Sequence, residues 1–315
     1  MTWFQRLLLI TLLATFVLVI VGGTVRATDS GLGCPDWPTC HGSLIPKAEK
    51  HTLIEWSHRT VAAVVGFLFL GVTYAAFRDE RRHTREFWIA FAAGVVLVVQ
   101  IALGAITVER ELPAEITAAH LGTAMIFMGL MIVAFMLSRF RSRAMSVFGG
   151  AADSPFSRMA VVAAVAAFAT LVLGSYISGT DASLACDGWP LCNGSVVPDG
   201  GQHVGLHYLH RVLAGILGVL MLGLIYLGFE ERRNQPWLLV LPAFGGVAYV
   251  AQALIGAANI WTELAAWVVV THLSLAALLW CTLVVVSVLS LYLPGEQAVA
   301  AEGEASRRRK AAEWA

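Results

Sequence analysis

Long apolar runs separated by short polar segments dominate the pattern along the chain. Each run comes close to the ~20 consecutive apolar residues that an α-helix needs to cross the hydrocarbon core of a bilayer. The first run follows Arg6, but it is too long for a signal peptide and no small-residue cleavage site closes it, so we expect a helix there too. The pattern predicts an all-α integral membrane protein of eight transmembrane helices, at about 7–25, 55–77, 87–108, 115–138, 157–178, 206–229, 237–260 and 265–292.

Composition agrees with a membrane protein, and the charge pattern adds an orientation. Hydrophobic residues make up 58% of the 315 residues and charged residues 13%, with a formal net charge of zero. Arginines gather in alternate connections, and such connections face the cytoplasm. We therefore expect a multi-pass protein of the cell membrane with both termini cytoplasmic, surrounded by membrane lipid and without a nucleic-acid partner. The cations concerned are Arg78, Arg81, Arg82, Arg85, Arg139, Arg141, Arg143, Arg158, Arg232, Arg233, Arg308, Arg309 and Lys310.

Sliding the sequence over itself by 152 residues superposes its two halves without a gap. Each half holds four predicted helices, an even number, so both halves enter the bilayer in the same orientation. We expect two tandem four-helix bundles related by a pseudo-twofold axis along the membrane normal. The predicted parts are an N-terminal bundle (1–142), a cytoplasmic linker (143–157), a C-terminal bundle (158–293) and a charged cytoplasmic tail (294–315). The matches include Cys34/Cys186, Trp37/Trp189, Pro38/Pro190, Cys40/Cys192, His58/His210, Arg59/Arg211, Gln100/Gln252, Gly104/Gly256 and His120/His272.

Four histidines lie a few residues inside one end of a predicted helix. In the first half, His58 and His120 lie at the same depth on the second and fourth helices, and His210 and His272 repeat this arrangement. Two histidines on neighbouring helices at one depth can hold a flat macrocycle and supply axial nitrogens to its iron. A single membrane histidine is as readily explained by a hydrogen bond between helices, but four at repeat-related positions favour haem.

An arginine directly follows one histidine of each half, Arg59 in the first and Arg211 in the second. Two interpretations remain open because they share one geometry. Either the arginines extend to the outer membrane interface, or they pair with haem propionates that point the same way.

One position beside the histidines differs between the halves. Glu55, three residues before His58 and on the same helical face, is replaced by His207 three residues before His210. A carboxylate beside only one site could take or deliver protons during chemistry on a bound ligand. The alternative is a capping box with Thr52, in which Glu55 satisfies the first turn of its helix. His207 could also replace His210 as a ligand, although the repeated His-Arg pair favours His210.

Each half carries two cysteines in the long loop after its first helix, Cys34 and Cys40 in one and Cys186 and Cys192 in the other. Both loops are predicted outside the cytoplasm, where duplicated cysteine pairs indicate two disulfides. A thiol–disulfide role in electron delivery stays open beside the structural one. Zinc is disfavoured because two cysteines per loop leave its ligand set incomplete.

With these residues assembled, the sequence resembles the haem A synthase family over about residues 5–292. The resemblance is carried by the loop Gly31-Leu32-Gly33-Cys34 with Trp37-Pro38 and Cys40, by Glu55-Trp56-Ser57-His58-Arg59, by Ala118-Ala119-His120, and by the second-half residues His210-Arg211 and His272.

This resemblance implies an enzyme that oxidises the C8 methyl of haem O to the formyl group of haem A through successive hydroxylations, for use in terminal oxidases. It implies haem O bound at His58 and His120, a b-type haem (iron protoporphyrin IX) as cofactor held by His210 and His272, and Glu55 as the catalytic carboxylate. The Cys34–Cys40 disulfide belongs to the family's loop pattern. The expected partners are haem O synthase and terminal oxidase assembly factors, and a homo-oligomer is left open.

Two other classes of function compete with this one. A diheme b-type electron-transfer cytochrome would have two interchangeable bis-histidine sites and no chemistry on either haem. A haem transporter or chaperone would bind haem reversibly and leave its mass unchanged, but the midplane sites and broken helices of transporters are not evident. The sequence assigns no role to His207 and names neither the electron acceptor nor the oxygen source.

Overall fold

The computed structural model describes residues 1–78, 84–140, 154–231 and 237–292. Within these ranges the chain forms eight helices, all long and apolar enough to cross a membrane. Each coincides with one predicted span to within five residues at either end, and the largest difference is at α2, which begins at Lys50 rather than near residue 55. The all-α membrane fold is confirmed. The helices are α1 (Trp3–Ala27), α2 (Lys50–Arg78), α3 (Arg85–Glu109), α4 (Ala114–Arg139), α6 (Pro155–Gly179), α7 (Gln202–Glu231), α8 (Trp237–Trp261) and α9 (Ala266–Tyr292).

Local sequence explains several helix ends. α1 begins after Thr2, whose hydroxyl accepts a hydrogen bond from the Gln5 amide while the Gln5 side chain accepts one from the Thr2 amide. This reciprocal pair is a capping box. α6 begins after Ser154, whose side chain accepts from the Ser157 amide, and Pro155 opens the helix where its missing N–H costs nothing.

The repeat recurs in the backbone conformation. Non-glycine residues with positive φ occur in pairs that are 152 positions apart, namely Asp29/Asp181, His41/Asn193, Glu111/Glu263 and Leu112/Leu264. The left-handed region is sparsely populated by residues that carry a Cβ. Its use at matched positions shows that the loops after α1 and α6, and the turns after α3 and α8, are built alike.

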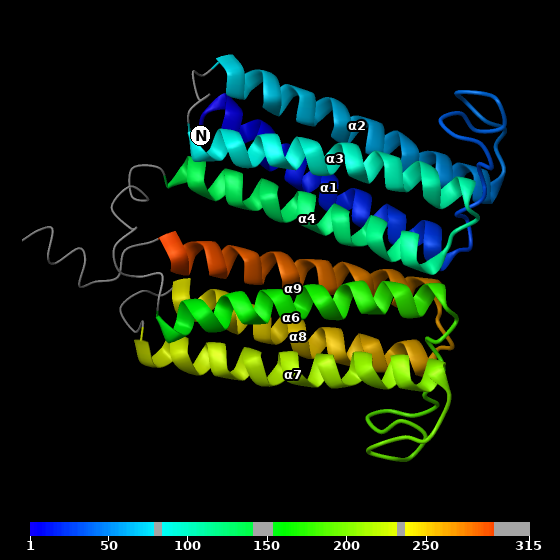
Figure 1. Ribbon diagram of the computed structural model, residues 1–315, viewed down its shortest axis with the longest axis vertical. Helices are drawn as coiled ribbons and strands as arrows, with labels where there is room; N and C mark the ends of the chain where they lie inside the picture. Colours follow the sequence, from blue (N-terminus) through cyan, green and yellow to red (C-terminus); the bar gives the residue numbers. More distant parts are fainter. Residues whose placement is uncertain (79–83, 141–153, 232–236, 293–315) are drawn as a thin grey trace, which may run out of the picture.

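Helices of the same half pack mainly on one another, while α1, α4, α6 and α9 carry the contacts between the halves (Figure 1). Close approach there depends on small residues. The position of a Cβ on Gly129 of α4 lies 2.7 Å from Trp280 of α9, and one on Gly23 of α1 lies 2.8 Å from Leu273. The predicted division into parts stays a prediction, because residues 141–153 of the linker region and the tail 294–315 lie outside the described residues.

A contact near the ends of α1 and α6 that lead into the cysteine loops joins two equivalent positions of the repeat. The guanidinium of Arg26 donates to the backbone carbonyl of Ser178, which is 152 residues farther along the chain. Arg26 also forms an ion pair of 3.5 Å with Asp29 in the first turn of the loop.

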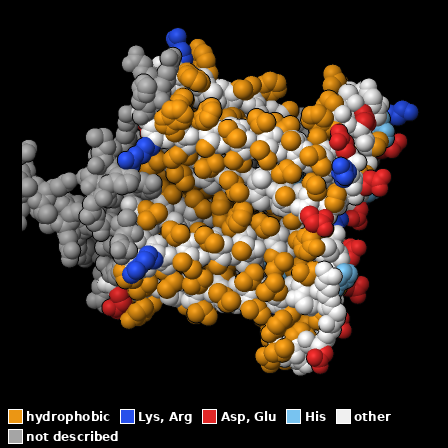
Figure 2. Space-filling model, in the orientation of Figure 1, with side chains coloured by type: hydrophobic (Ala, Val, Ile, Leu, Met, Phe, Trp, Pro, Cys, Tyr) orange, Lys and Arg blue, Asp and Glu red, His pale blue; other side chains and the backbone are white. Residues whose placement is uncertain are grey.

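Both cysteine loops lie at one end of the helices, and the N-terminus lies at the other end (Figure 1). Apolar side chains cover the surface between the two ends, acidic side chains gather mainly at the end with the cysteine loops, and lysines and arginines lie at the ends of the apolar region (Figure 2). A band of this kind is what a bilayer-spanning protein presents to lipid. Which end faces the cytoplasm stays a prediction.

Candidate functional site

The two histidines of the first half each pack against a glycine on the neighbouring helix. His58 of α2 faces Gly22 of α1, where a Cβ would lie 3.2 Å from the histidine Nε2. His120 of α4 faces Gly104 of α3, where a Cβ would lie 3.0 Å from the histidine Cε1. A larger residue at either glycine would therefore displace the imidazole.

The second half repeats this arrangement. His210 of α7 faces Gly174 of α6, and His272 of α9 faces Gly256 of α8, each with 3.0 Å between the imidazole Cε1 and the position of a Cβ. The sequence comparison matched Gly104 with Gly256, but it missed Gly22 and Gly174, which are also 152 residues apart. The repeat offset was the signal that could have found them.

Hydrogen bonding distinguishes the nitrogens of these imidazoles. The amide nitrogen of Gln100 lies 3.3 Å from Nε2 of His120, and that of Gln252 lies 3.3 Å from Nε2 of His272. The Nδ1 atoms of His120, His210 and His272 are buried without a hydrogen-bond partner. A buried polar nitrogen without a partner is costly. A neutral imidazole can bind iron through the ring nitrogen that carries no proton, so these buried histidines fit a haem in each half in the tautomer that leaves the iron-facing nitrogen unprotonated.

Glu55 lies one helical turn before His58 on α2 and is almost completely buried, with 4% of its surface exposed. Its carboxylate accepts a hydrogen bond of 3.0 Å from the backbone amide of Cys34 and one of 2.6 Å from the guanidinium of Arg59. The capping-box alternative is wrong, because α2 begins at Lys50 and the Thr52 hydroxyl donates to the carbonyl of Gly33 in the loop. Glu55 instead holds the cysteine loop against α2.

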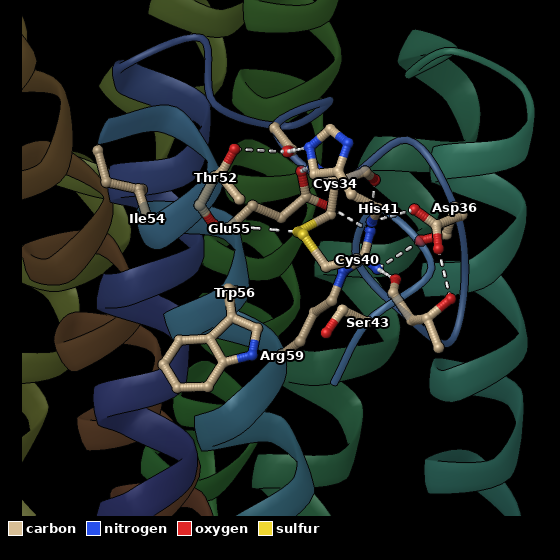
Figure 3. Close-up of a disulfide and its surroundings, with 12 residues drawn as sticks. Cys34, Asp36, Cys40, His41, Ser43, Thr52, Ile54, Glu55, Trp56 and Arg59 are labelled. Carbon is tan, nitrogen blue, oxygen red and sulfur yellow. Dashed lines mark hydrogen bonds and ion pairs between the residues drawn. A yellow bond between two sulfur atoms is a disulfide. The ribbon is translucent and has the colours of Figure 1, made fainter. Parts of the chain in front are cut away.

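Arg59 completes this attachment (Figure 3). Its terminal nitrogens donate to the carbonyls of Cys34, Asp36 and Thr39 at 2.6–2.8 Å, in addition to Glu55. A guanidinium has four N–H groups on these two nitrogens, and the four bonds use them. A propionate contact through the same nitrogens would require the loop to release them.

His207 occupies the place of Glu55 in the second half. It is also buried, and its Nδ1 accepts a hydrogen bond of 3.3 Å from the backbone amide of Cys186. Arg211 donates to the carbonyls of Leu191 at 2.9 Å, Cys186 at 3.4 Å and Pro190 at 3.5 Å. Glu55 and His207 thus perform the same task for their loops, but only the first loop is held by an ion pair.

Both predicted disulfides, Cys34–Cys40 and Cys186–Cys192, are present. In the first loop, the Asp36 carboxylate accepts hydrogen bonds from the hydroxyl of Thr39 and from the backbone amides of Gly42 and His41. These bonds lower the pKa of Asp36 from its ordinary value to about 2. In the second loop, Asn193 accepts from the amide of Asp187. The two loops therefore share a disulfide and differ in the side chains that order them.

Two other features of the described residues lie outside the histidine sites. No three His, Cys, Asp or Glu side chains in this part of the chain gather as a site for a bare metal ion. A groove of about 530 Å³ between α4 and α6 is mostly apolar, with Glu115 and Tyr176 as its ionisable side chains. The residues that line it include none of the four histidines.

Within the described residues, eight helices long and apolar enough to span a membrane, with paired histidines packed against glycines in each half, define a multi-pass membrane protein. Residues 5–284 match the family described as cytochrome oxidase assembly protein, and the chain belongs to that family.

Curated relatives carry a more particular name. The chain is 32% identical to "Heme A synthase" of Symbiobacterium thermophilum, over 78% of this chain and 84% of that protein. It is 30% identical to "Heme A synthase" of Shouchella clausii, over 82% and 87% of the two chains. Against "Heme A synthase" of Shewanella oneidensis the identity is 27%, over 91% of this chain and 96% of the relative.

Proposed function

We propose that this protein is a haem A synthase, an oxidoreductase that converts the C8 methyl of haem O to a formyl group for the haem A of terminal oxidases. Its relatives of that name match most of the chain. The observation that carries the proposal is the pair of histidine sites combined with a buried carboxylate in the first half only.

His58 and His120 are the proposed ligands of the substrate haem O. The glycines opposite them allow the imidazoles to lie close to the neighbouring helices, and Gln100 orients His120 through its Nε2. An imidazole fixed in this way loses little side-chain entropy when it binds iron.

His210 and His272 are the proposed ligands of a resident b-type haem. Such a haem, when bound, supplies one-electron redox capacity beside the substrate site, and the methyl-to-formyl conversion removes four electrons in all. Gln252 orients His272 as Gln100 orients its counterpart.

Glu55 is the proposed proton acceptor. The Arg59 guanidinium and the Cys34 amide both stabilise its ionised form, and both fix its carboxylate beside the helical face that carries His58. A carboxylate held in this way can take a proton from one hydroxyl of the hydrated aldehyde and return it to the hydroxyl that leaves as water.

Replacing Glu55 by His tests this role, because histidine at the equivalent position of the second half already accepts the loop amide. Glu55→His should keep the loop in place and end haem O conversion. Glu115→Gln, which removes a carboxylate from the α4–α6 groove, is the matched control and should convert normally. The assay is expression with haem O supply, followed by mass analysis of the extracted porphyrins. Full conversion by Glu55→His would show that Glu55 serves the loop alone.

One observation favours a second candidate, a diheme electron-transfer cytochrome. Because Glu55 and His207 both accept a loop amide, part of the difference between the halves is already explained without chemistry. The same porphyrin analysis separates the candidates. Hydroxylated haem or haem A in the wild-type protein supports the enzyme, whereas unmodified haem alone supports the cytochrome or a haem transporter.

The arginine pattern supports an orientation with both termini in the cytoplasm and the cysteine loops outside. In that orientation the histidine sites and Glu55 lie near the outer face of the cell membrane. Attachment of a membrane-impermeant reagent to a cysteine introduced at the exposed Leu44 would test it, and labelling only after the cells are opened would reverse the orientation.

A further inference from the structure

The interface between the second and third helices differs between the halves. In the second half, Tyr249 of α8 reaches across to α7, and its hydroxyl donates a hydrogen bond of 2.9 Å to the carbonyl of Ala214. Its ring lies over Gly218, where a Cβ would be 2.7 Å from the Tyr249 Cζ. The tyrosine therefore fills the space between α7 and α8 at this depth.

The first half keeps the receiving positions but lacks the tyrosine. Ala62 and Gly66 of α2 correspond to Ala214 and Gly218, while Leu97 of α3 corresponds to Tyr249. A Cβ on Gly66 would meet nothing within 4 Å. A Cβ on Gly66 would thus enter open space, whereas one on its counterpart Gly218 would meet the Tyr249 ring.

Farther toward the other end of the helices, α2 and α3 do touch. A Cβ on Gly94 of α3 would lie 3.1 Å from the Phe69 ring of α2, and Phe69 is buried. The open space beside Gly66 therefore lies nearer than this contact to the end of α2 that carries His58. Along α2, Ala62 and Gly66 follow His58 at intervals of four residues, which places all three on one face of the helix.

The same stretch of α3 reaches the other histidine. Gln100, three residues after Leu97, lies 3.3 Å from His120. The outward surface beside it is apolar and faces lipid, with Phe67 73% and Val98 67% exposed. A lipophilic molecule in the bilayer would meet this surface before it met either histidine.

We propose that haem O enters the first site from the bilayer between α2 and α3, and that its isoprenoid tail lies in the space beside Gly66 and Leu97. This inference rests on the proposed function, in which the first haem is exchanged at each turnover and the second stays. An isoprenoid tail is the group that haem O has and haem b lacks, and an apolar space open to lipid suits it. Tyr249 closes the corresponding route in the second half, where a resident haem must be retained.

The test is Leu97→Tyr, which recreates the second-half contact on receiving positions that are already present. Purified Glu55→Gln protein, which is expected to bind haem O without converting it, is mixed with phospholipid vesicles carrying haem O, and uptake is followed by haem absorbance. Adding Leu97→Tyr should slow uptake about tenfold, as a filled space requires the helices to separate first. Val219→Phe, which adds bulk to the lipid-facing side of α7 in the other half, should leave uptake unchanged.

Retention of haem b in Leu97→Tyr shows that the variant is folded. The reciprocal variant, Tyr249→Leu, tests whether the tyrosine retains the haem of the second half. Tyr249→Leu should release its resident haem about tenfold faster and admit haem O to the second site. Wild-type uptake rates in Leu97→Tyr, together with unchanged retention in Tyr249→Leu, would overturn the inference. If the wild-type protein binds haem O through this interface but never converts it, the proposed function fails while the entry route stands.

Discussion

Removing the Arg59 guanidinium should loosen the first cysteine loop far more than removing Arg211 loosens the second. Arg59→Met keeps the length and apolar packing of the side chain but deletes four hydrogen bonds, one of them to the buried Glu55 carboxylate. Breaking a buried ion pair from one side costs roughly 3–5 kcal/mol. Since 16% of the Arg59 side chain is exposed, we take the lower end, about 3 kcal/mol.

Arg211→Met removes one hydrogen bond of 2.9 Å and two longer ones, and it leaves no carboxylate unpaired because His207 stands in that place. A hydrogen bond from a charged donor contributes about 1.5–3 kcal/mol, so about 1.5 kcal/mol is expected. Every 1.4 kcal/mol is about a factor of ten in an equilibrium constant. The first loop should therefore open about a hundredfold more often and the second only about tenfold.

Hydrogen exchange measured by mass spectrometry on peptides covering 30–49 and 182–201 reads both loops in one sample. The Cys34 and Cys186 amides, which donate to Glu55 and His207, are the reporters nearest the change. Equal loss of protection in the two loops would refute the reasoning, because the ion pair would then add nothing. Unchanged protection of the first loop in Arg59→Met would also refute the reasoning.

Three further outcomes are expected. Gly104→Val should weaken haem binding by roughly tenfold or more in a haem titration, because the branched side chain displaces the imidazole of His120. Gly215→Val is the control and should bind haem normally, since a Cβ at that position meets nothing within 4 Å. The hydrogen bonds of the Asp36 carboxylate stabilise the loop fully above the ordinary carboxyl pKa and are lost as the pH falls through about 2. The rate of proteolysis in the first loop should therefore be constant from neutral pH to about pH 4. Asp36→Asn should be cleaved faster over this whole range. Replacing Cys34 and Cys40 together by serine should destabilise the loop by about 2 kcal/mol, since the disulfide closes only a short segment, and a much larger loss by hydrogen exchange would contradict a mainly entropic contribution.

Much of the fold could be predicted because membrane helices are specified locally. A run of apolar residues long enough to span the bilayer satisfies its own backbone hydrogen bonds, so neither partner strands nor distant contacts are needed to place it. The exception was the start of α2, where Lys50 to Glu55 continue the helix above the apolar run. His51, Thr52 and Glu55 are polar and contact the cysteine loop, and a pattern based on hydrophobicity counts such residues as loop.

The residues of the candidate site could be chosen from the sequence, but most of their contacts could not. The repeat offset identified all four histidines, since equivalent positions need no knowledge of three-dimensional structure. The role of His207 could not be read in this way, because the Cys186 amide that it accepts comes from a loop that folds back over a distance of 21 residues. The attachment of Arg59 to loop carbonyls was hidden for the same reason, since backbone acceptors leave no mark in a sequence.

The contact between Arg26 and Ser178 bears on how a chain of two halves can differ from a pair of identical chains. Equivalent positions can touch only where the axis that relates them passes, so at this point each residue meets its own counterpart. In a homodimer of one half, that point would present two arginines or two serines. Two guanidinium groups so close together would repel each other. In a single polypeptide the two positions can change independently, so here one guanidinium donates to the backbone of a serine and meets no second guanidinium.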